Sequence, residues 1–301
     1  MSIHLSQYAL VIAALATISF AGEEEGHAHL TSDGAGSSGH WVDPWEHAHF
    51  REGTPLEHHF DLEPAFLGRD LIVDYSGLTF AEESEHEIEL ELEWALSNRI
   101  GFIIEQPYII SDPDTGSESS GLGDLAVVPR VVVADRGPWV VAANLEMVAP
   151  TGNSRVGAGE HWHFAPFINT WCDLGNWWTF SSQAGFEFAP ASGEKEFFFA
   201  LGVAKSLRVW DEAHGDEAHG EDDHGHRHER HGGILTMMAE LSGAAVVEGD
   251  PAEEGVYELE GLVGLSLGVI EGLDLRMAYR FPLNGNSELE KGLTIGAIHH
   301  F

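Results

Sequence analysis

Histidine and acidic side chains gather in two parts of the chain and could together bind metal ions. In the stretch 207–233 the sequence Asp-Glu-Ala-His-Gly occurs twice, at 211–215 and 216–220. Imidazole and carboxylate groups suit zinc, nickel and copper(II). Because this stretch has low complexity, we expect loosely bound Zn, Ni or Cu and no required cofactor; the alternative is a solvated acidic loop that is merely rich in histidine. The candidate ligands are His214, His219, His224, His226, His228 and His231 and, nearer the N-terminus, His47, His49, His58 and His59.

A second chemical pattern is a regular alternation of carboxylates. Glu87, Glu89, Glu91 and Glu93 alternate with apolar residues over 87–94. Successive side chains of a β-strand point to opposite faces, so a strand places all four carboxylates on one face, whereas a helix would scatter them. We therefore expect a strand here with one acidic and one apolar face.

Motifs that signal catalysis are scarce. The sequence has no phosphate-binding Walker loop and no His-Glu-x-x-His. One Gly-x-Ser-x-Gly pattern lies at 264–268, but a nucleophile elbow needs a strand-to-helix turn around its serine, and this pattern lies inside an alternating stretch. We therefore expect the protein not to be an enzyme.

The composition excludes further classes. The 301 residues carry 14 Lys plus Arg against 50 Asp plus Glu, a net charge of −36 with His neutral. We expect no nucleic-acid partner, because binding phosphate backbones requires clustered cations. Hydrophobic residues make up 43% of the chain, which is too many for a disordered acidic protein. The single cysteine, Cys172, excludes a disulfide framework.

The elements that would position these side chains are predicted to be β-strands. From residue 71 onward, segments of about ten residues alternate apolar and polar side chains between turn-forming clusters, which is the pattern of a transmembrane β-barrel. We predict an all-β fold: a closed antiparallel transmembrane β-barrel of about 12 strands with an irregular N-terminal arm. The expected strands are 71–80, 87–96, 100–110, 122–132, 138–148, 161–172, 177–188, 196–206, 234–246, 257–268, 273–281 and 291–301.

The predicted connections differ in length between the two ends of this barrel. Those at the end of the C-terminus are short, such as 97–99 and 173–176, whereas opposite ones are longer, such as 81–86 and 149–160. Outer-membrane barrels have short periplasmic turns and longer extracellular loops. The insertion 207–233 is the exception, because it is long and falls on the periplasmic side.

The N-terminal region divides into two parts. Residues 10–20 are mostly apolar and are followed by a small-x-small cleavage pattern, so we expect a signal peptide over 1–21 that is cleaved on export. Residues 22–70 are polar, acidic and His-rich, and we expect them to form a periplasmic arm. Residues 71–301 would then form a barrel in the bacterial outer membrane, in contact with lipid.

If the apolar phase faces lipid, the polar phase lines the lumen. Acids outnumber bases on this phase, so the lumen should concentrate cations. Tryptophans near strand ends are expected at the membrane interfaces, among them Trp139, Trp162, Trp171, Trp177 and Trp178. The lumen residues that we predict are Glu87, Glu89, Glu91, Glu93, Glu105, Glu146, Glu258, Glu260, Arg276 and Arg280.

Two short motifs flank one predicted hairpin: Gly121-Leu122-Gly123-Asp124 enters it and Ala149-Pro150-Thr151-Gly152-Asn153 leaves it. The chain also ends in an aromatic strand residue, Phe301. In these features residues 71–301 resemble the outer-membrane "transporter" family of the meta-pathway of phenol degradation. The resemblance implies an outer-membrane barrel that passes small, often hydrophobic molecules. The His-rich segments depart from the family pattern.

These observations favour a channel or transporter for small solutes that is linked to divalent transition-metal handling, with a small molecule or metal ion as its solute. Two alternatives remain open. One is a soluble periplasmic metal-binding β-sandwich, and the other is a barrel channel for hydrophobic aromatic compounds in which the histidines are incidental.

Overall fold

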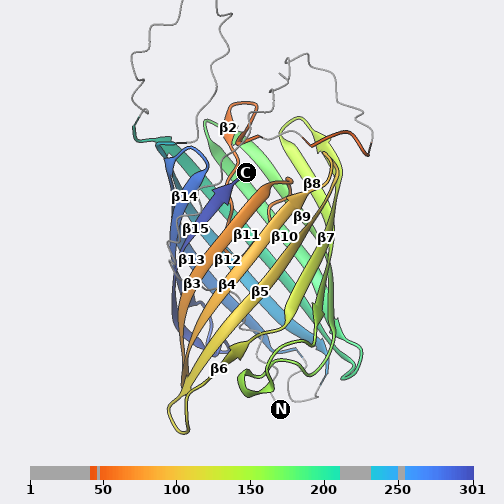
Figure 1. Cartoon of the computed structure of the whole chain (residues 1–301), viewed down its shortest axis with the longest axis vertical. Helices are drawn as coiled ribbons and strands as arrows, with labels where there is room; N and C mark the ends of the chain where they lie inside the picture. Colours follow the sequence, from red (N-terminus) through yellow and green to blue (C-terminus); the bar gives the residue numbers. More distant parts are fainter. Residues whose placement is uncertain (1–40, 46–47, 211–231, 250–254) are drawn as a thin grey trace, which may run out of the picture.

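The chain folds into one closed antiparallel sheet. The computed structural model describes residues 41–45, 48–210, 232–249 and 255–301. The sheet closes because β4 pairs with both β3 and β5. β6 and β7 follow one another along β5, so the thirteen strands of the sheet form a twelve-stranded barrel wall. Figure 1 shows the resulting cylinder of tilted strands.

The strand bounds agree with the alternation in the sequence. The wall consists of β3 Arg69–Phe80, β4 Glu83–Ala95, β5 Ile100–Pro113, β6 Ser119–Leu122, β7 Leu125–Arg136, β8 Trp139–Ala149, β9 His163–Gly175, β10 Trp178–Ala189, β11 Glu194–Arg208, β12 Ile234–Glu248, β13 Tyr257–Ile270, β14 Leu273–Pro282 and β15 Leu289–His300. The predicted fold class is confirmed, and closure of the sheet excludes the β-sandwich.

Several predicted boundaries require correction. The strand expected over 122–132 is β7 at 125–136, preceded by the short β6 at 119–122. β4 begins at Glu83, so the loop expected over 81–86 is only a tight turn at 81–82. β11 ends at Arg208, so the insertion expected over 207–233 begins at 209. β3 begins at Arg69, because Phe301 donates a backbone hydrogen bond to its carbonyl and extends the pairing of the first and last strands.

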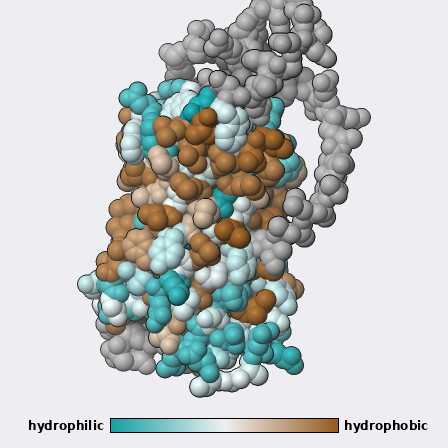
Figure 2. Space-filling view, turned by 90° about the vertical axis from the view of Figure 1, so that its left-hand side faces the viewer, coloured by the Kyte–Doolittle hydropathy of each residue, from teal (hydrophilic) through white to brown (hydrophobic). Residues whose placement is uncertain are grey.

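The two faces of the wall differ as the period of two requires. In β4, Glu87 and Glu93 are 0% and 1% exposed, whereas Leu90 between them is 47% exposed. The carboxylates therefore point into the barrel, and the apolar side chains cover its outside. Figure 2 shows hydrophobic residues gathered over the upper and middle part of one outer face, with hydrophilic residues toward its lower end.

Helical structure is minor in the part of the chain that the structure describes. It contains one 3-10 turn, Ser154–Val156. No helix among those residues is long and apolar enough to cross a membrane.

The two motifs around the hairpin meet in the structure. The Asp124 carboxylate lies between β6 and β7 and accepts hydrogen bonds from the backbone N–H of Gly152 at 2.7 Å and of Gly159 at 3.0 Å. Gly152 leaves no room for a side chain, since a Cβ there would lie 2.6 Å from the Gly123 carbonyl carbon. The motifs thus fasten the loop after β8 to the start of β7 and belong to the scaffold.

Candidate functional site

A segment of the N-terminal region fills part of the barrel lumen. A short hairpin, β1 Phe50–Arg51 with β2 Thr54–Pro55, lies at the same end of the barrel as the C-terminus (Figure 1). The following residues, 56–68, then contact the inward faces of several strands before β3 begins. We call residues 56–68 the plug.

The carboxylate of Glu240 holds the turn of the plug. Glu240, on the inner face of β12, accepts hydrogen bonds from the backbone N–H of Phe60 at 3.0 Å and of Asp61 at 2.8 Å. Because these N–H groups lie away from water, the charged acceptor compensates for their lost hydration. The wall therefore binds the backbone of the plug as well as its side chains.

Two arginines of β14 hold the same turn. Arg280 forms an ion pair with Asp61, and Ser242 donates to the other carboxylate oxygen of Asp61 at 2.9 Å. Arg276 forms an ion pair with Asp74 of β3 and donates to the carbonyl of His59 at 3.2 Å. Burial raises the pKa of Asp61 to about 6, although Arg280 acts in the opposite direction.

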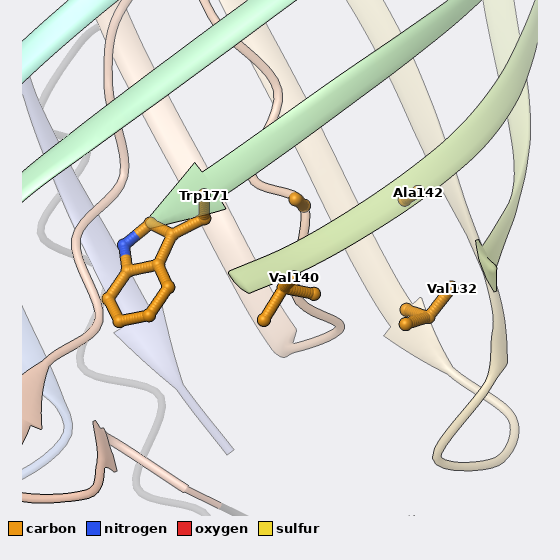
Figure 3. Close-up of a cluster of buried hydrophobic side chains, with 5 residues drawn as sticks. Val132, Val140, Ala142 and Trp171 are labelled. Carbon is orange, nitrogen blue, oxygen red and sulfur yellow. The ribbon is translucent and has the colours of Figure 1, made fainter. Parts of the chain in front are cut away.

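Hydrogen bonds hold the start of the plug, and apolar contacts hold its end. Glu57 accepts hydrogen bonds from the indole N–H of Trp171 at 3.1 Å and from the hydroxyl of Thr179. Trp171 is 1% exposed and packs with Val132, Val140, Ala142 and Ala65 of the plug. Figure 3 shows the side chains of this cluster, with the indole nitrogen of Trp171 directed away from the valines. The prediction that Trp171 lies at a membrane interface is therefore wrong, because the side chain points inward and binds Glu57.

A chain of polar contacts connects the plug to the opposite wall. Arg130 of β7 donates to Glu93 at 3.2 Å and to Asn144 at 3.3 Å, and Asn144 in turn donates to Asn169 at 2.9 Å. Asn169 completes the chain by donating to the backbone carbonyls of Glu63 and Pro64, at 2.8 and 3.0 Å. A segment bound at so many points is an ordered part of the barrel interior.

His59 is a buried cation of the plug. Its two ring nitrogens lie 3.5 Å from Glu57 and 3.3 Å from Glu240. Burial lowers the pKa of His59, but the two carboxylates outweigh that effect and raise the pKa to about 10. The imidazolium therefore neutralises part of the acidic interior at neutral pH.

An acidic cavity of about 420 Å³ lies between the plug and the far mouth of the barrel. Its lining includes plug residues 58–64 and strand ends remote from the C-terminus, such as Glu187 and Glu258. Fourteen carboxylate side chains line it against the guanidinium groups of Arg276 and Arg280. Both guanidinium groups are engaged by acids, so the remaining carboxylates set the sign of the potential.

The structure places each predicted lumen residue on the inner face. The residues lining the cavity are Glu89, Glu91, Glu93, Glu105, Glu146, Glu258, Glu260, Arg276 and Arg280. Glu87 is on the same face of β4 and is fully buried.

The predicted metal ligands are not brought together as one group. His58 and His59 are 7% and 6% exposed inside the barrel, and His49 packs edge-on against the ring of His300. The expectation of loose periplasmic sites is thus corrected for His58 and His59, because the barrel wall surrounds them. The arm expected over 22–70 is corrected in the same way for residues 56–70. The other predicted metal ligands lie outside the described residues: His47, His214, His219, His224, His226, His228 and His231. The expected signal peptide over 1–21 also lies outside them.

Several residues of the site were not predicted from the sequence. Asp61, Glu63, Asn169 and Gln183 all make plug contacts, and Gln183 accepts a hydrogen bond from the Glu63 N–H at 3.0 Å. One signal was present in the sequence: the dense run of charged and histidine residues over 57–63 directly before the first strand.

The Gly-x-Ser-x-Gly pattern lies inside β13. Ser266 is 7% exposed and donates to Asp274 on the neighbouring strand at 3.3 Å. Its hydroxyl is thus bound to a carboxylate, and no strand-to-helix turn follows. This is not the geometry of a nucleophile elbow.

The closed wall, the apolar exterior and the polar interior define an outer-membrane β-barrel. The model of the family described as putative MetA-pathway of phenol degradation matches residues 77–228, just over half of the chain. The chain belongs to this family.

One solved structure shows the same fold, and two further ones are similar to the chain at lower scores. An outer membrane channel from Pseudomonas putida F1 has a TM-score of 0.55 at 12% sequence identity, over 81% of this chain and 100% of that chain. A NanC porin has a TM-score of 0.49 at 10% identity, over 77% and 99% of the two chains. A KdgM porin has a TM-score of 0.48 at 11% identity, over 76% and 99%. At these identities the likeness concerns the fold. No curated protein matches the chain.

Proposed function

We propose that the protein is an outer-membrane channel for small solutes, with an acidic lumen that favours cations and a plug that narrows it. The observation that carries this proposal is the cavity of about 420 Å³, whose carboxylates far outnumber its guanidinium groups. A low-dielectric wall focuses the field of such charges and raises the local cation concentration. Passage would be passive.

The test is ion selectivity in planar bilayers. The variant combines Glu146→Gln, Glu187→Gln, Glu258→Gln and Glu288→Gln, four acids of the cavity lining. We expect the ratio of cation to anion permeability to fall several-fold, because four charges leave the cavity lining. The control neutralises four exposed acids that lie outside the cavity: Glu82→Gln, Glu118→Gln, Glu160→Gln and Glu271→Gln. Equal selectivity in the two variants would contradict the proposal.

A second candidate solute is a neutral aromatic compound. The observation that favours it is the set of aromatic rings among the cavity residues, which includes Phe80, Phe167, Phe198 and Phe199. The description of the family also names phenol degradation. Liposome flux distinguishes the two: faster entry of a neutral phenol than of an organic cation of similar size would favour the aromatic solute.

Transition-metal handling through the His-rich stretch 211–231 stays a prediction from the sequence. Deleting 213–231 tests it: unchanged tolerance of cells to zinc, copper and nickel would remove that role.

A further inference from the structure

Two histidines and an aspartate meet where the plug touches the first and last strands of the barrel. His58 belongs to the plug, Asp70 to β3 and His300 to β15, and Asp70 and His300 are direct partners in the strand register. One ligand atom from each lies within 4.8 Å of the others. Two imidazoles and one carboxylate are a common ligand set for zinc and related ions.

The distances suit a shared ion. The His58 Nε2 lies 3.5 Å from one Asp70 oxygen, and the His300 Nδ1 lies 2.6 Å from the other. With zinc–ligand bonds of about 2.0–2.2 Å, tetrahedral ligand atoms lie roughly 3.3–3.6 Å apart. The first separation already has this value. The second is a hydrogen-bond distance, so the His300 ring would have to move away from Asp70 by roughly 0.7 Å for an ion to enter.

The other nitrogen of each imidazole also faces a carboxylate. The His58 Nδ1 lies 3.5 Å from a Glu93 oxygen, and the His300 Nε2 lies 3.9 Å from an Asp274 oxygen. In metal sites the second nitrogen of a ligating histidine is commonly oriented by such a group. The side chain of His58 is only 6% exposed, and its Nδ1 lacks a hydrogen bond of normal geometry. The arrangement therefore has a ligand layer and an orienting layer.

We propose that His58, Asp70 and His300 form a binding site for one divalent transition-metal ion, with zinc as the best-suited ion. The ion would fasten the plug to the seam between β3 and β15. This site differs from the loose binding expected of the stretch 211–231, because its ligands come from three separate elements and are held by the barrel wall. It does not depend on whether the barrel conducts solutes.

The test measures metal binding to the full chain in detergent. To remove background, the six histidines at 214, 219, 224, 226, 228 and 231 are changed to Asn. The protein is stripped with a chelator and titrated with Zn²⁺ by calorimetry and with Co²⁺ by visible absorption. Into this background we introduce His58→Ala or His300→Gln, with His299→Ala as the matched control, because His299 is the exposed neighbour in the same strand.

We expect one tight equivalent of Zn²⁺ in the background protein and in the His299→Ala variant, with d–d bands typical of nitrogen and oxygen ligands for Co²⁺. His58→Ala and His300→Gln should each weaken binding by at least tenfold. Heat-modifiable migration on a gel checks that each variant still forms the barrel. If the background protein binds no tight equivalent of Zn²⁺, the proposal is wrong whatever the variants show. Equal affinity of His58→Ala and His299→Ala would overturn it as well.

Discussion

At the scale of single residues, the interior depends on which carboxylates have a cationic or hydrogen-bonding partner. Glu240 and Asp61 are satisfied by backbone N–H groups and by Arg280, respectively. Glu63 is less well compensated, since its nearest guanidinium, Arg130, is 3.8 Å away. Burial raises the pKa of Glu63 to about 7, and Arg130 offsets only part of this effect. Of the two plug carboxyls with raised pKa values, Glu63 therefore titrates nearer to neutrality than Asp61.

This carboxyl should make the seating of the plug pH-dependent. Because the pKa of Glu63 is raised from 4.5 when the plug is seated, stabilisation is complete below about pH 4.5 and is lost as pH rises through about 7. Between pH 5.5 and pH 8 this stabilisation should change by about 2 kcal/mol. The charged or titratable groups facing Glu63 come from four strands and the plug: Arg130 of β7, Glu89, Glu91 and Glu93 of β4, Glu105 of β5, Arg276 of β14 and His58 of the plug.

Hydrogen exchange of the peptide 57–66, corrected for intrinsic rates, measures this dependence. In the native protein we expect faster exchange at pH 8 than at pH 5.5. In Glu63→Gln the difference should be clearly smaller, and Asp61 accounts for what remains, while Glu196→Gln, on β11, should retain the full difference. An unaltered pH dependence in Glu63→Gln would contradict the assignment.

For a single residue, the sequence predicts the direction of its side chain within a strand but not its partner from a distant part of the chain. The inward direction of Glu89 or Glu105 follows from the period of two within a strand. The pairing of Phe60 with Glu240 cannot be derived in this way, because 180 residues separate the two and the plug has no periodicity of its own. The inward orientation of Trp171 was missed for a related reason: its partner Glu57 lies in the plug.

At the scale of elements, alternation was sufficient to find the twelve long strands of the wall but not the short β6, which lay in a predicted connection. Alternation identifies a strand without showing what lies inside the barrel. Two glycines on the inner face mark the places where the plug approaches the wall. A Cβ at Gly202 of β11 would lie 2.6 Å from the His59 ring, and one at Gly264 of β13 would lie 2.6 Å from the Phe60 ring. These strands lack side chains where the plug approaches them.

Filling one of these positions should displace the plug while leaving the barrel closed. In a Cys172→Ser, Leu62→Cys background, Gly202→Val should increase the rate of maleimide labelling of the new thiol at least tenfold, because Leu62 is only 4% exposed in the seated plug. Gly285→Val is the control, since a Cβ at Gly285 meets nothing within 4 Å. The steric account fails if Gly202→Val and Gly285→Val label at the same slow rate.

At the scale of the whole molecule, the barrel is a lipid-facing cylinder whose interior has two parts. Near the C-terminal end the plug binds the inner faces of β9, β10, β12 and β14. Toward the other end lies the acidic cavity. Short turns predominate on the side of the C-terminus, with the connection 209–233 as the exception, and this favours the prediction that this end is periplasmic. A solute entering from outside would therefore meet carboxylates first and the plug second.

The most direct test of this account is the single-channel conductance of the full chain compared with a variant in which residues 57–66 are replaced by a Gly-Ser segment of equal length. If the plug occupies the lumen, the native protein should show a small conductance and the variant one that is several-fold larger, with preference for cations retained in both. Identical conductances in the two proteins would show that residues 57–66 do not obstruct the lumen and would contradict the account.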